Sequence, residues 1–298
     1  MYGDFQSMPE RIRVQVGDRH VMLSHLDKPL WPAFSKAQML DYYLKVADVL
    51  IPHVRRRPAA FVRCPAGVEG PQFFSHEVPD GLPNWIATAE KGGRTQVSLD
   101  DTPTLISVAN AYCLELHVPQ WTAETGPDLH DRLIFDLDPG EGADITTCAR
   151  VALLVHERLR ADGLTGVPAT SGGLGLHVYV ALDPPWQVED VTGYTKSLAK
   201  RLTAAHRDLI THTRGPKARA GGRVLVDWQQ NVSRATTSAP YTLRARDDAP
   251  GVSVPLTWSE VEAASPEALA FSPADVLARI AEHGDLAHGL FDPAARSA

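Results

Sequence analysis

Cysteine, long apolar runs and net positive charge are all scarce in this sequence. Its 298 residues include three cysteines, Cys64, Cys113 and Cys148, which are too few and too scattered for a disulfide framework or a zinc site. No apolar run approaches the roughly 18 residues that a membrane-spanning helix needs. Residues 1–15 lack the charged-then-apolar pattern of a secretion signal. We therefore expect a reduced, cytoplasmic protein with no membrane partner.

The net charge of −7 argues against a nucleic-acid partner, because proteins that bind nucleic acids usually carry a basic surplus. The charges are unevenly distributed, however. Residues 247–298 contain nine acidic and two basic residues, whereas residues 198–246 contain ten Lys and Arg against two Asp. Arg63 and the run at 55–57 form a second basic patch. Clustered positive charge on an otherwise neutral body suits phosphate binding, although a solvated basic surface would have the same composition.

The rest of the composition, 44% hydrophobic and 22% charged, is typical of a globular protein. Apolar periodicity predicts strands that alternate with helices. We expect helices at 35–52, 148–160 and 190–210, strands at 133–138, 176–182 and 224–228, and helix starts at Ser265 and Ser272. Ser35 and Gln38 have the spacing of a capping box. This alternation of elements predicts a mixed α/β (α+β) fold.

Two carboxylates lie close together in the predicted strand at 133–138. Asp136 and Asp138 are two residues apart, so both side chains project from the same face, while Leu137 between them points into the core. Asp227 stands in a third apolar strand, where a charge needs a partner. Together the three aspartates predict a site for two divalent ions. A solvated strand end and the D-x-D motif of a sugar-nucleotide transferase are the alternatives.

A glycine-rich turn, SGGLGLH, occupies residues 171–177. Its glycines allow close approach to a ligand and expose backbone N–H groups to an anion. It is neither a Walker loop nor a dinucleotide-binding fingerprint, because no Gly-Lys-Ser/Thr follows and a strand, not a helix, comes next. His177 at its end is either a phosphate contact or a hydrogen-bonded core residue.

The order of the motifs is more specific than any one of them. His117 in LELHVPQW is followed by RLIFDLDPG, TSGGLGLHVYV, VLVDWQQN and APYTLRAR. From about Leu23 to Trp258 the chain resembles the polymerase domain of bacterial DNA ligase D, a branch of the archaeo-eukaryotic primase-polymerase superfamily. This resemblance implies a mixed-sheet catalytic core that carries the Asp triad, with a helix-containing N-terminal lobe. We expect a single domain over 1–298, in which 1–110 form the lobe, 111–246 the core and 247–298 an acidic helical segment.

The resemblance also implies roles for individual residues. Asp136, Asp138 and Asp227 match the family's catalytic ligands of two Mn²⁺ or Mg²⁺ ions. The positions that match its nucleotide site are His117, Ser171, Gly172, Gly173, His177, Gln230, Arg244 and Arg246. Those that match its DNA contacts are Lys28 and Lys36 for a 5′-phosphate, in a pocket that also includes His25, and Phe73 and Phe74 for template stacking. Our candidates for contacts to the DNA backbone are Arg63, which the chain shares with the family, and Arg214, Lys217 and Arg219 of the basic segment. The chain departs from the family at His25 and His76, where Asn and Lys respectively are common.

These matches imply a template-dependent DNA-repair nucleotidyltransferase. It would add NTPs or dNTPs to a primer 3′-hydroxyl at short gaps or double-strand break ends, in gap filling or non-homologous end joining. The implied partners are gapped or broken DNA with a 5′-phosphate, Ku and a DNA ligase, and the implied location is the nucleoid. A primase that starts chains de novo and a non-catalytic DNA-end-binding module are the alternatives. The sequence fits either a stand-alone paralogue or one domain of a longer ligase.

Overall fold

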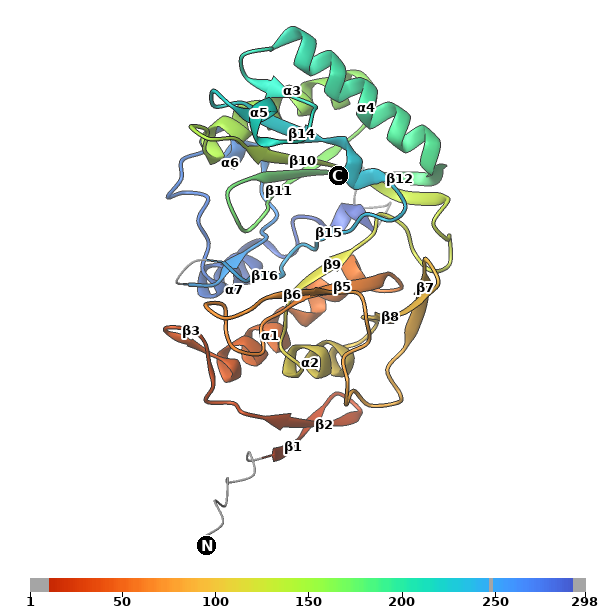
Figure 1. Cartoon of the computed structure of the whole chain (residues 1–298), viewed down its shortest axis with the longest axis vertical. Helices are drawn as coiled ribbons and strands as arrows, with labels where there is room; N and C mark the ends of the chain where they lie inside the picture. Colours follow the sequence, from red (N-terminus) through yellow and green to blue (C-terminus); the bar gives the residue numbers. More distant parts are fainter. Residues whose placement is uncertain (1–10, 247–248, 292–298) are drawn as a thin grey trace, which may run out of the picture.

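In the computed structural model, which describes residues 11–246 and 249–291, two β-sheets face each other and helices cover their outer faces (Figure 1). One sheet has five strands and the other six. Segments β15 and β16 run between the two layers, so residues from the second half of the chain reach both sheets (Figure 1). The mixed α/β fold predicted from the sequence is confirmed.

The five-stranded sheet forms the upper layer in Figure 1 and is mostly antiparallel. Its strands, in spatial order, are β11 (Gly166–Thr170), β12 (Leu176–Gln187), β10 (Leu129–Pro139), β14 (Val224–Asp227) and β13 (Ile210–Thr211). Helices α3 (Ile145–Ala161) and α4 (Val188–Ala205) cover its outer face, and the short helices α5 (Pro216–Arg219) and α6 (Trp258–Glu262) flank it. Leu133, Phe135 and Leu137 of β10 are fully buried in the core between sheet and helices, as the alternation predicts.

The six-stranded sheet forms the lower layer (Figure 1). Its strands are β15 (Thr237–Ser238), β9 (Cys113–Val118), β5 (Pro58–Arg63), β8 (Arg94–Ser98) and β7 (Thr88–Lys91) in spatial order, with β6 (Phe73–Ser75) paired to β5. Helices α1 (Lys36–Val54) and α2 (Thr102–Asn110) cover the outer face. Both bury apolar side chains such as Tyr43 and Leu105 in a core shared with β5 and β9.

Smaller elements connect and flank the two layers. They are the two-stranded ribbons β1 (Arg11–Val16) with β2 (Arg19–Ser24), β3 (Pro29–Trp31) with β4 (Phe34–Ser35), and β16 (Leu243–Arg244) with β17 (Gly251–Val252), the helix α7 (Pro273–His283), and the 3₁₀ turns at Trp228–Asn231 and His288–Leu290. No helix in the described part of the chain is both long and apolar enough to cross a membrane. Residues 247–248 and 292–298 of the acidic C-terminal segment lie outside the described residues.

Several helix predictions are confirmed and two are wrong. Ser35 caps α1 through the predicted capping box with Gln38, and Ser272 caps α7. The helix predicted at 190–210 ends at Ala205, because His206 leaves the helical conformation and Ile210 extends to pair with β14. The apolar pattern continues past the helix because Ile210 enters the same core. Ser265 starts a single turn and no helix, since the chain must extend again to reach the cap at Ser272.

Candidate active site

Strand register brings the acidic residues together at the centre of the five-stranded sheet. Asp136 on β10 lies opposite His177 on β12 and opposite Asp227 on β14. Ligand oxygens of Asp136, Asp138 and Asp227 lie within 4.8 Å of one another. The inner face of the sheet therefore presents three carboxylates, two from β10 and one from β14, while its outer face packs against the helices.

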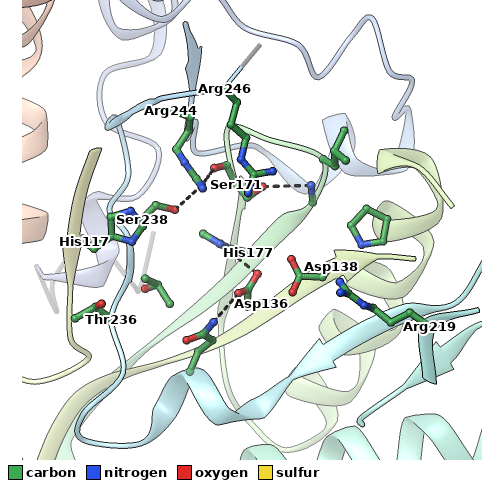
Figure 2. Close-up of a pocket in the computed structure, with 15 residues that line it drawn as sticks. His117, Asp136, Asp138, Ser171, His177, Arg219, Thr236, Ser238, Arg244 and Arg246 are labelled. Atoms are coloured by element: carbon green, nitrogen blue, oxygen red, sulfur yellow. Dashed lines mark hydrogen bonds and ion pairs between the residues drawn. The ribbon is translucent and has the colours of Figure 1, made fainter. Parts of the chain in front are cut away.

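A polar cavity of about 350 Å³ opens beside Asp136 and Asp138. It lies between the layers, and in Figure 2 the two aspartates and Arg219 stand below Arg244, Arg246 and Ser171. The wall comprises His117, Asp136, Asp138, Pro139, Ser171, Leu174, Gly175, His177, Arg219, Gln230, Thr236, Thr237, Ser238, Arg244 and Arg246. The cavity thus pairs carboxylates on one side with guanidinium groups on the other.

The carboxylates perturb one another's ionisation. Burial and the neighbouring charges of Asp136 and Asp227 raise the pKa of Asp138 to about 6. Burial also acts to raise the pKa of Asp136, but hydrogen bonds from His177 and Gln230 outweigh it and the pKa falls. Burial raises the pKa of Asp227 despite its contact with Arg214. A hard divalent cation would relieve this repulsion, so the donor set fits Mg²⁺ or Mn²⁺.

Hydrogen bonds from neighbouring elements hold Asp136 in place. Gln230 Nε2 donates to Asp136 Oδ2 at 3.1 Å, and His177 Nε2 lies 3.4 Å from Oδ1. The other ring nitrogen of His177 bonds the Tyr179 hydroxyl, which donates to the backbone oxygen of Ser238 at 3.0 Å. His177 therefore links the aspartates to the segment that lines the opposite wall.

Asn231, which the sequence analysis did not single out, fixes the turn that carries Gln230. Its side chain accepts from Ile134 N–H at 2.8 Å and donates to Ile134 O at 2.7 Å, as a neighbouring strand would. It is fully buried and also donates to Trp228 O. The turn after Asp227 is thus bound to the backbone of β10, two residues from Asp136.

The basic residues predicted to contact the DNA backbone lie in different places. Arg214 donates to Asp227 through Nε at 2.9 Å and Nη2 at 2.6 Å. Arg219 lines the cavity beside Asp138, and its charge lowers the pKa of that carboxyl. Lys217 is exposed on α5. Two of these three residues of the basic segment therefore lie next to the carboxylates.

The glycine turn forms one wall of the cavity and its backbone is tightly enclosed. Ser171 Oγ accepts from the N–H groups of Gly173 and Gly175 at 3.3 and 3.2 Å. Gly172 has φ +70°, and a Cβ there would lie 2.5 Å from Arg244 Cγ. Arg244 Nη1 donates to Ser171 O and, at 3.0 Å, to Ser238 Oγ. A larger residue at 172 would displace Arg244, so the glycine is required by packing as well as by its conformation.

Glu115, which the sequence analysis missed, organises the base of this wall. Its Oε2 lies 2.8 Å from His117 Nε2 and 3.0 Å from Arg244 Nε, and its Oε1 accepts from Ala245 N–H at 2.8 Å. Burial acts to raise its pKa, but these partners outweigh burial and lower the pKa to about 2. The sequence does contain a signal that could have identified Glu115. It lies two residues before His117 on an otherwise apolar strand, which is the same spacing as that of Asp136 and Asp138.

The remaining residues that the sequence analysis missed are Thr236, Thr237 and Ser238. They line the cavity where the chain crosses from the five-stranded sheet to β15. They match no motif used in the sequence analysis, and strand pairing of β15 with β9 brings them beside His117.

The adjacent phenylalanines are both exposed, at 55% for Phe73 and 53% for Phe74. Successive strand residues normally face opposite sides, yet neither ring enters the core. Phe74 meets the His117 ring edge-on, with ring centroids 5.3 Å apart. The exposed ring of Phe74 therefore lies next to a residue that lines the cavity.

The two lysines predicted to bind a 5′-phosphate lie together around Tyr112. Lys36 Nζ is 4.2 Å from the Tyr112 ring centroid, and Lys28 Nζ is 5.2 Å from it. Burial, with a contribution from Lys28, lowers the pKa of Lys36 to about 8. Arg63 donates to the backbone oxygen of Ala111, next to Tyr112. His25, which is exposed, precedes Lys28 by a turn in which its carbonyl accepts from Lys28 N–H at 3.1 Å.

The raised pKa of Asp138 leads to a prediction about stability. A carboxyl whose pKa is raised from 3.8 to about 6 by folding destabilises the folded state increasingly between those pH values. Asp138→Asn should therefore raise the free energy of unfolding of the metal-free protein by about 2 kcal/mol above pH 6, and by little near pH 4. Urea unfolding in EDTA at several pH values measures the difference. A gain in unfolding free energy that does not depend on pH would contradict this explanation. The control is Asp41→Asn, on the surface of α1.

Fold and site together define the class of protein. Clustered carboxylates that suit divalent cations, with arginines and a glycine turn on the facing wall, are the features of a metal-dependent α/β protein that acts on phosphate esters. A sequence model described as "LigD, primase-polymerase domain" matches residues 35–287. The chain belongs to the LigD primase-polymerase domain family.

Similar proteins agree with this assignment. The chain is 40% identical over 282 residues to a "Multifunctional non-homologous end joining protein LigD" of Mycobacterium bovis, covering 90% of this chain and 37% of that protein. It is 28% identical over 251 residues to a "Bifunctional non-homologous end joining protein LigD" of Bacillus subtilis, covering 84% and 40% respectively. The structure matches "Polymerase Domain from Mycobacterium tuberculosis Ligase D in complex with DNA" with a TM-score of 0.83 and 38% identity, covering 91% of this chain and 98% of that one. The chain thus spans about two fifths or less of the length of these LigD proteins and almost all of the solved domain.

Proposed function

We propose that this protein is a metal-dependent nucleotidyltransferase that extends a primer 3′-hydroxyl with NTPs or dNTPs at short gaps or broken DNA ends. The observation that carries the proposal is the cluster of three carboxylates, within 4.8 Å of one another, beside a cavity whose far wall bears Arg244 and Arg246. Carboxylates alone would fit many hydrolases, and arginines alone would fit many anion sites. Their combination across one cavity suits transfer of a nucleotide from a triphosphate.

The residues around the cavity would have different roles in the reaction. Asp136, Asp138 and Asp227 would hold the Mn²⁺ or Mg²⁺ ions, which when bound activate the attacking hydroxyl and neutralise charge on the phosphates. Arg244 and Arg246 would bind and orient the triphosphate through charge-assisted hydrogen bonds.

The glycine turn and the residues around Asp136 complete the site. Ser171 and Gly175 line the cavity, and the N–H groups of Gly173 and Gly175 hold the Ser171 hydroxyl in place by donating to its Oγ, so the turn would present Ser171 to the nucleotide. His177 and Gln230 hold Asp136 in the orientation that metal binding needs. His117 would contact the nucleotide from the opposite side of the cavity.

Two features outside the cavity support DNA as the second substrate. The exposed rings of Phe73 and Phe74 are available for stacking with a template base, because a nucleobase is planar and aromatic like the phenyl ring. Lys28 and Lys36 both lie against the Tyr112 ring, and a 5′-phosphate there would offset the burial and the charge of Lys28 that lower the pKa of Lys36. A DNA complex of the similar Mycobacterium tuberculosis domain supports the same reading.

We further propose that the whole chain forms one domain. In it, 1–110 provide the phosphate pocket, 111–246 the catalytic core and 247–298 an acidic helical segment. Such a domain would act on breaks in chromosomal DNA, in the cytoplasm and at the nucleoid. Its partners would be a protein that holds DNA ends, such as Ku, and a DNA ligase that seals the extended product.

The test is extension of a gapped duplex by the purified protein. Reactions compare NTPs with dNTPs, Mn²⁺ with Mg²⁺, and a gap with and without its 5′-phosphate. We expect extension that depends on template and metal and is stronger on the phosphorylated gap. Tight binding to DNA ends with no extension under any of these conditions would support the end-binding module instead.

Lys28 and Lys36 lead to a more specific prediction. Replacing both with Met keeps their apolar stems and removes both charges, and each charged hydrogen bond to a phosphate contributes about 1.5–3 kcal/mol. The double variant should lose at least about tenfold of the preference for a phosphorylated over an unphosphorylated gap. The measurement is the ratio of the two extension rates, which partial unfolding would not change. An unaltered ratio would refute the phosphate pocket, and Lys45→Met, on the exposed side of α1, is the control.

A further inference from the structure

A second cavity, of about 610 Å³, lies outside the site described above. It is bounded by the β7–β8 hairpin on one side and by residues 233–234 on the other. Its wall includes His76, Lys91, Arg94, Gln96, Trp121 and Arg234. None of these residues has a role in the proposed reaction.

Two polar side chains are buried in the wall of this cavity without strong partners. Gln96 is 2% exposed, and its Oε1 has no hydrogen-bond partner among the described residues. Lys91 is 9% exposed, and its Nζ donates a long hydrogen bond of 3.4 Å to Ala235 O. Burying a polar atom without a good partner is costly, so native proteins rarely do it without a ligand or a functional reason.

The charge around the cavity favours an anionic ligand. Arg94 and Arg234 are both exposed at its rim, and Lys91 lies within. Glu90, the acidic residue in the wall, accepts a hydrogen bond from the hydroxyl of Thr95 at 2.6 Å. The positive charges in the wall therefore exceed the negative, and its two buried polar side chains supply a donor, Lys91 Nζ, and an unpartnered acceptor, Gln96 Oε1.

The cavity adjoins the nucleotide site through a continuous row of rings. His76 meets Phe74 edge-on with centroids 5.1 Å apart, and Phe74 meets His117 at 5.3 Å. Along the chain, Arg234 lines the second cavity, and Thr236, two residues later, lines the cavity beside the aspartates. Phe74 thus lies between His117 of the first cavity and His76 of the second.

We infer that the second cavity is a subsite for one unpaired nucleotide, with the base edge against Lys91 and Gln96 and the phosphate between Arg94 and Arg234. Every nucleobase carries donors and acceptors side by side on its edge, which matches the unpaired Gln96 oxygen and the Lys91 ammonium. The subsite rests on the proposed function, because that function brings nucleotides to this face. The nucleotide has two possible sources, namely an unpaired residue of the DNA strand or a free NTP that would begin a new chain.

The test uses the double variant Lys91→Met/Gln96→Leu, which keeps the volume of both side chains and removes their polar atoms. The variant removes an unpartnered buried oxygen and two long hydrogen bonds of 3.4 Å, from Lys91 to Ala235 O and between Gln96 and His76, so the fold should persist. Arg94→Ala, at an exposed position, is a second variant that does not threaten folding. Lys45→Met, on the exposed side of α1, is the matched control.

The first arm measures binding to gapped DNA in EDTA, so it remains informative even if the protein extends no primer. 5-Iodouracil is placed in turn at each unpaired template position and crosslinked by light. We expect crosslinks to the peptides that contain His76 or Lys91 from one position only. Affinity should fall about tenfold or more in the double variant and severalfold in Arg94→Ala.

The second arm measures binding of labelled ATP to the complex of protein and single-stranded template, in Ca²⁺ without extension. Two sites in the wild type and one in the double variant would assign the subsite to a free nucleotide. A loss of affinity for gapped DNA, with the number of ATP sites unchanged, would assign the subsite to a residue of the DNA strand. Unchanged DNA affinity together with the same number of ATP sites in both proteins would overturn the subsite, whatever the extension assay shows.

Discussion

Asp136→Asn is expected to lower the rate of nucleotidyl transfer by about a thousandfold or more, because it removes a charge where metal-ion catalysis supplies several kcal/mol. Asp136 is central to the cluster, since register places it opposite both Asp227 and His177. Asparagine has the same shape and can still accept the hydrogen bond from Gln230. The fold should persist while cation binding fails.

Single-turnover extension of a gapped duplex in Mn²⁺ measures this effect. DNA affinity, measured separately without metal, should change little, because the proposed DNA contacts at Phe74 and Lys28 lie on the other sheet and its flanking ribbon. Asp41→Asn, at an exposed position on α1, should retain full activity. Extension by Asp136→Asn within tenfold of the wild-type rate would show that the carboxylate cluster does not hold the catalytic ions.

Glu115→Gln is expected to have the second largest effect. The substitution leaves the shape intact but removes the buried negative charge that both Arg244 and His117 contact. Breaking a buried ion pair by removing one partner costs about 3 kcal/mol or more. Arg244 would then lose its fixed orientation towards the triphosphate, so KM for the nucleotide should rise about 30-fold or more, given the strength of charge-assisted hydrogen bonds.

The measurements for Glu115→Gln distinguish a loss of Arg244 positioning from a general loss of protein stability. Steady-state extension well below the unfolding temperature should show a larger change in KM for the nucleotide than in kcat, with DNA affinity unchanged. The stabilisation from Glu115 should be full at neutral pH and disappear as pH falls from about 4.5 towards 2, because folding lowers its pKa to about 2. Glu124→Gln, which alters an exposed pair with Arg56, should affect neither quantity. A fall in kcat alone would contradict a role in orienting Arg244.

The contact between Arg214 and Asp227 gives the aspartate cluster a cation from the chain itself. Arg214 is exposed over about half of its side chain, whereas Asp227 is buried. Sequence reasoning placed Arg214 with the basic residues that face DNA, because it lies in the segment with the greatest positive charge. The structure shows which acid Arg214 contacts, and a count of charges along the sequence carries no information on that contact.

Prediction from sequence succeeded where the signal is local. Alternation along β10 correctly assigned Leu133, Phe135 and Leu137 to the core. A capping box correctly located the start of α1, and the Ser-Pro pair at Ser272 that of α7. Such patterns depend on neighbours two to four residues apart, which the sequence displays directly. The end of α4 was predicted wrongly for the opposite reason, since pairing of Ile210 with β14 decided it.

The sequence by itself determined the family, the acidic triad and the glycine turn, because these are short motifs in a fixed order. The tertiary structure decided which distant residues complete them. Glu115 is 130 residues from Ala245, whose N–H it accepts, and Gln230 is 94 residues from Asp136. The cavity around Gln96 is likewise formed by segments far apart in the chain. Contacts of this kind depend on how the two sheets face each other, and no local pattern of residue types records that arrangement.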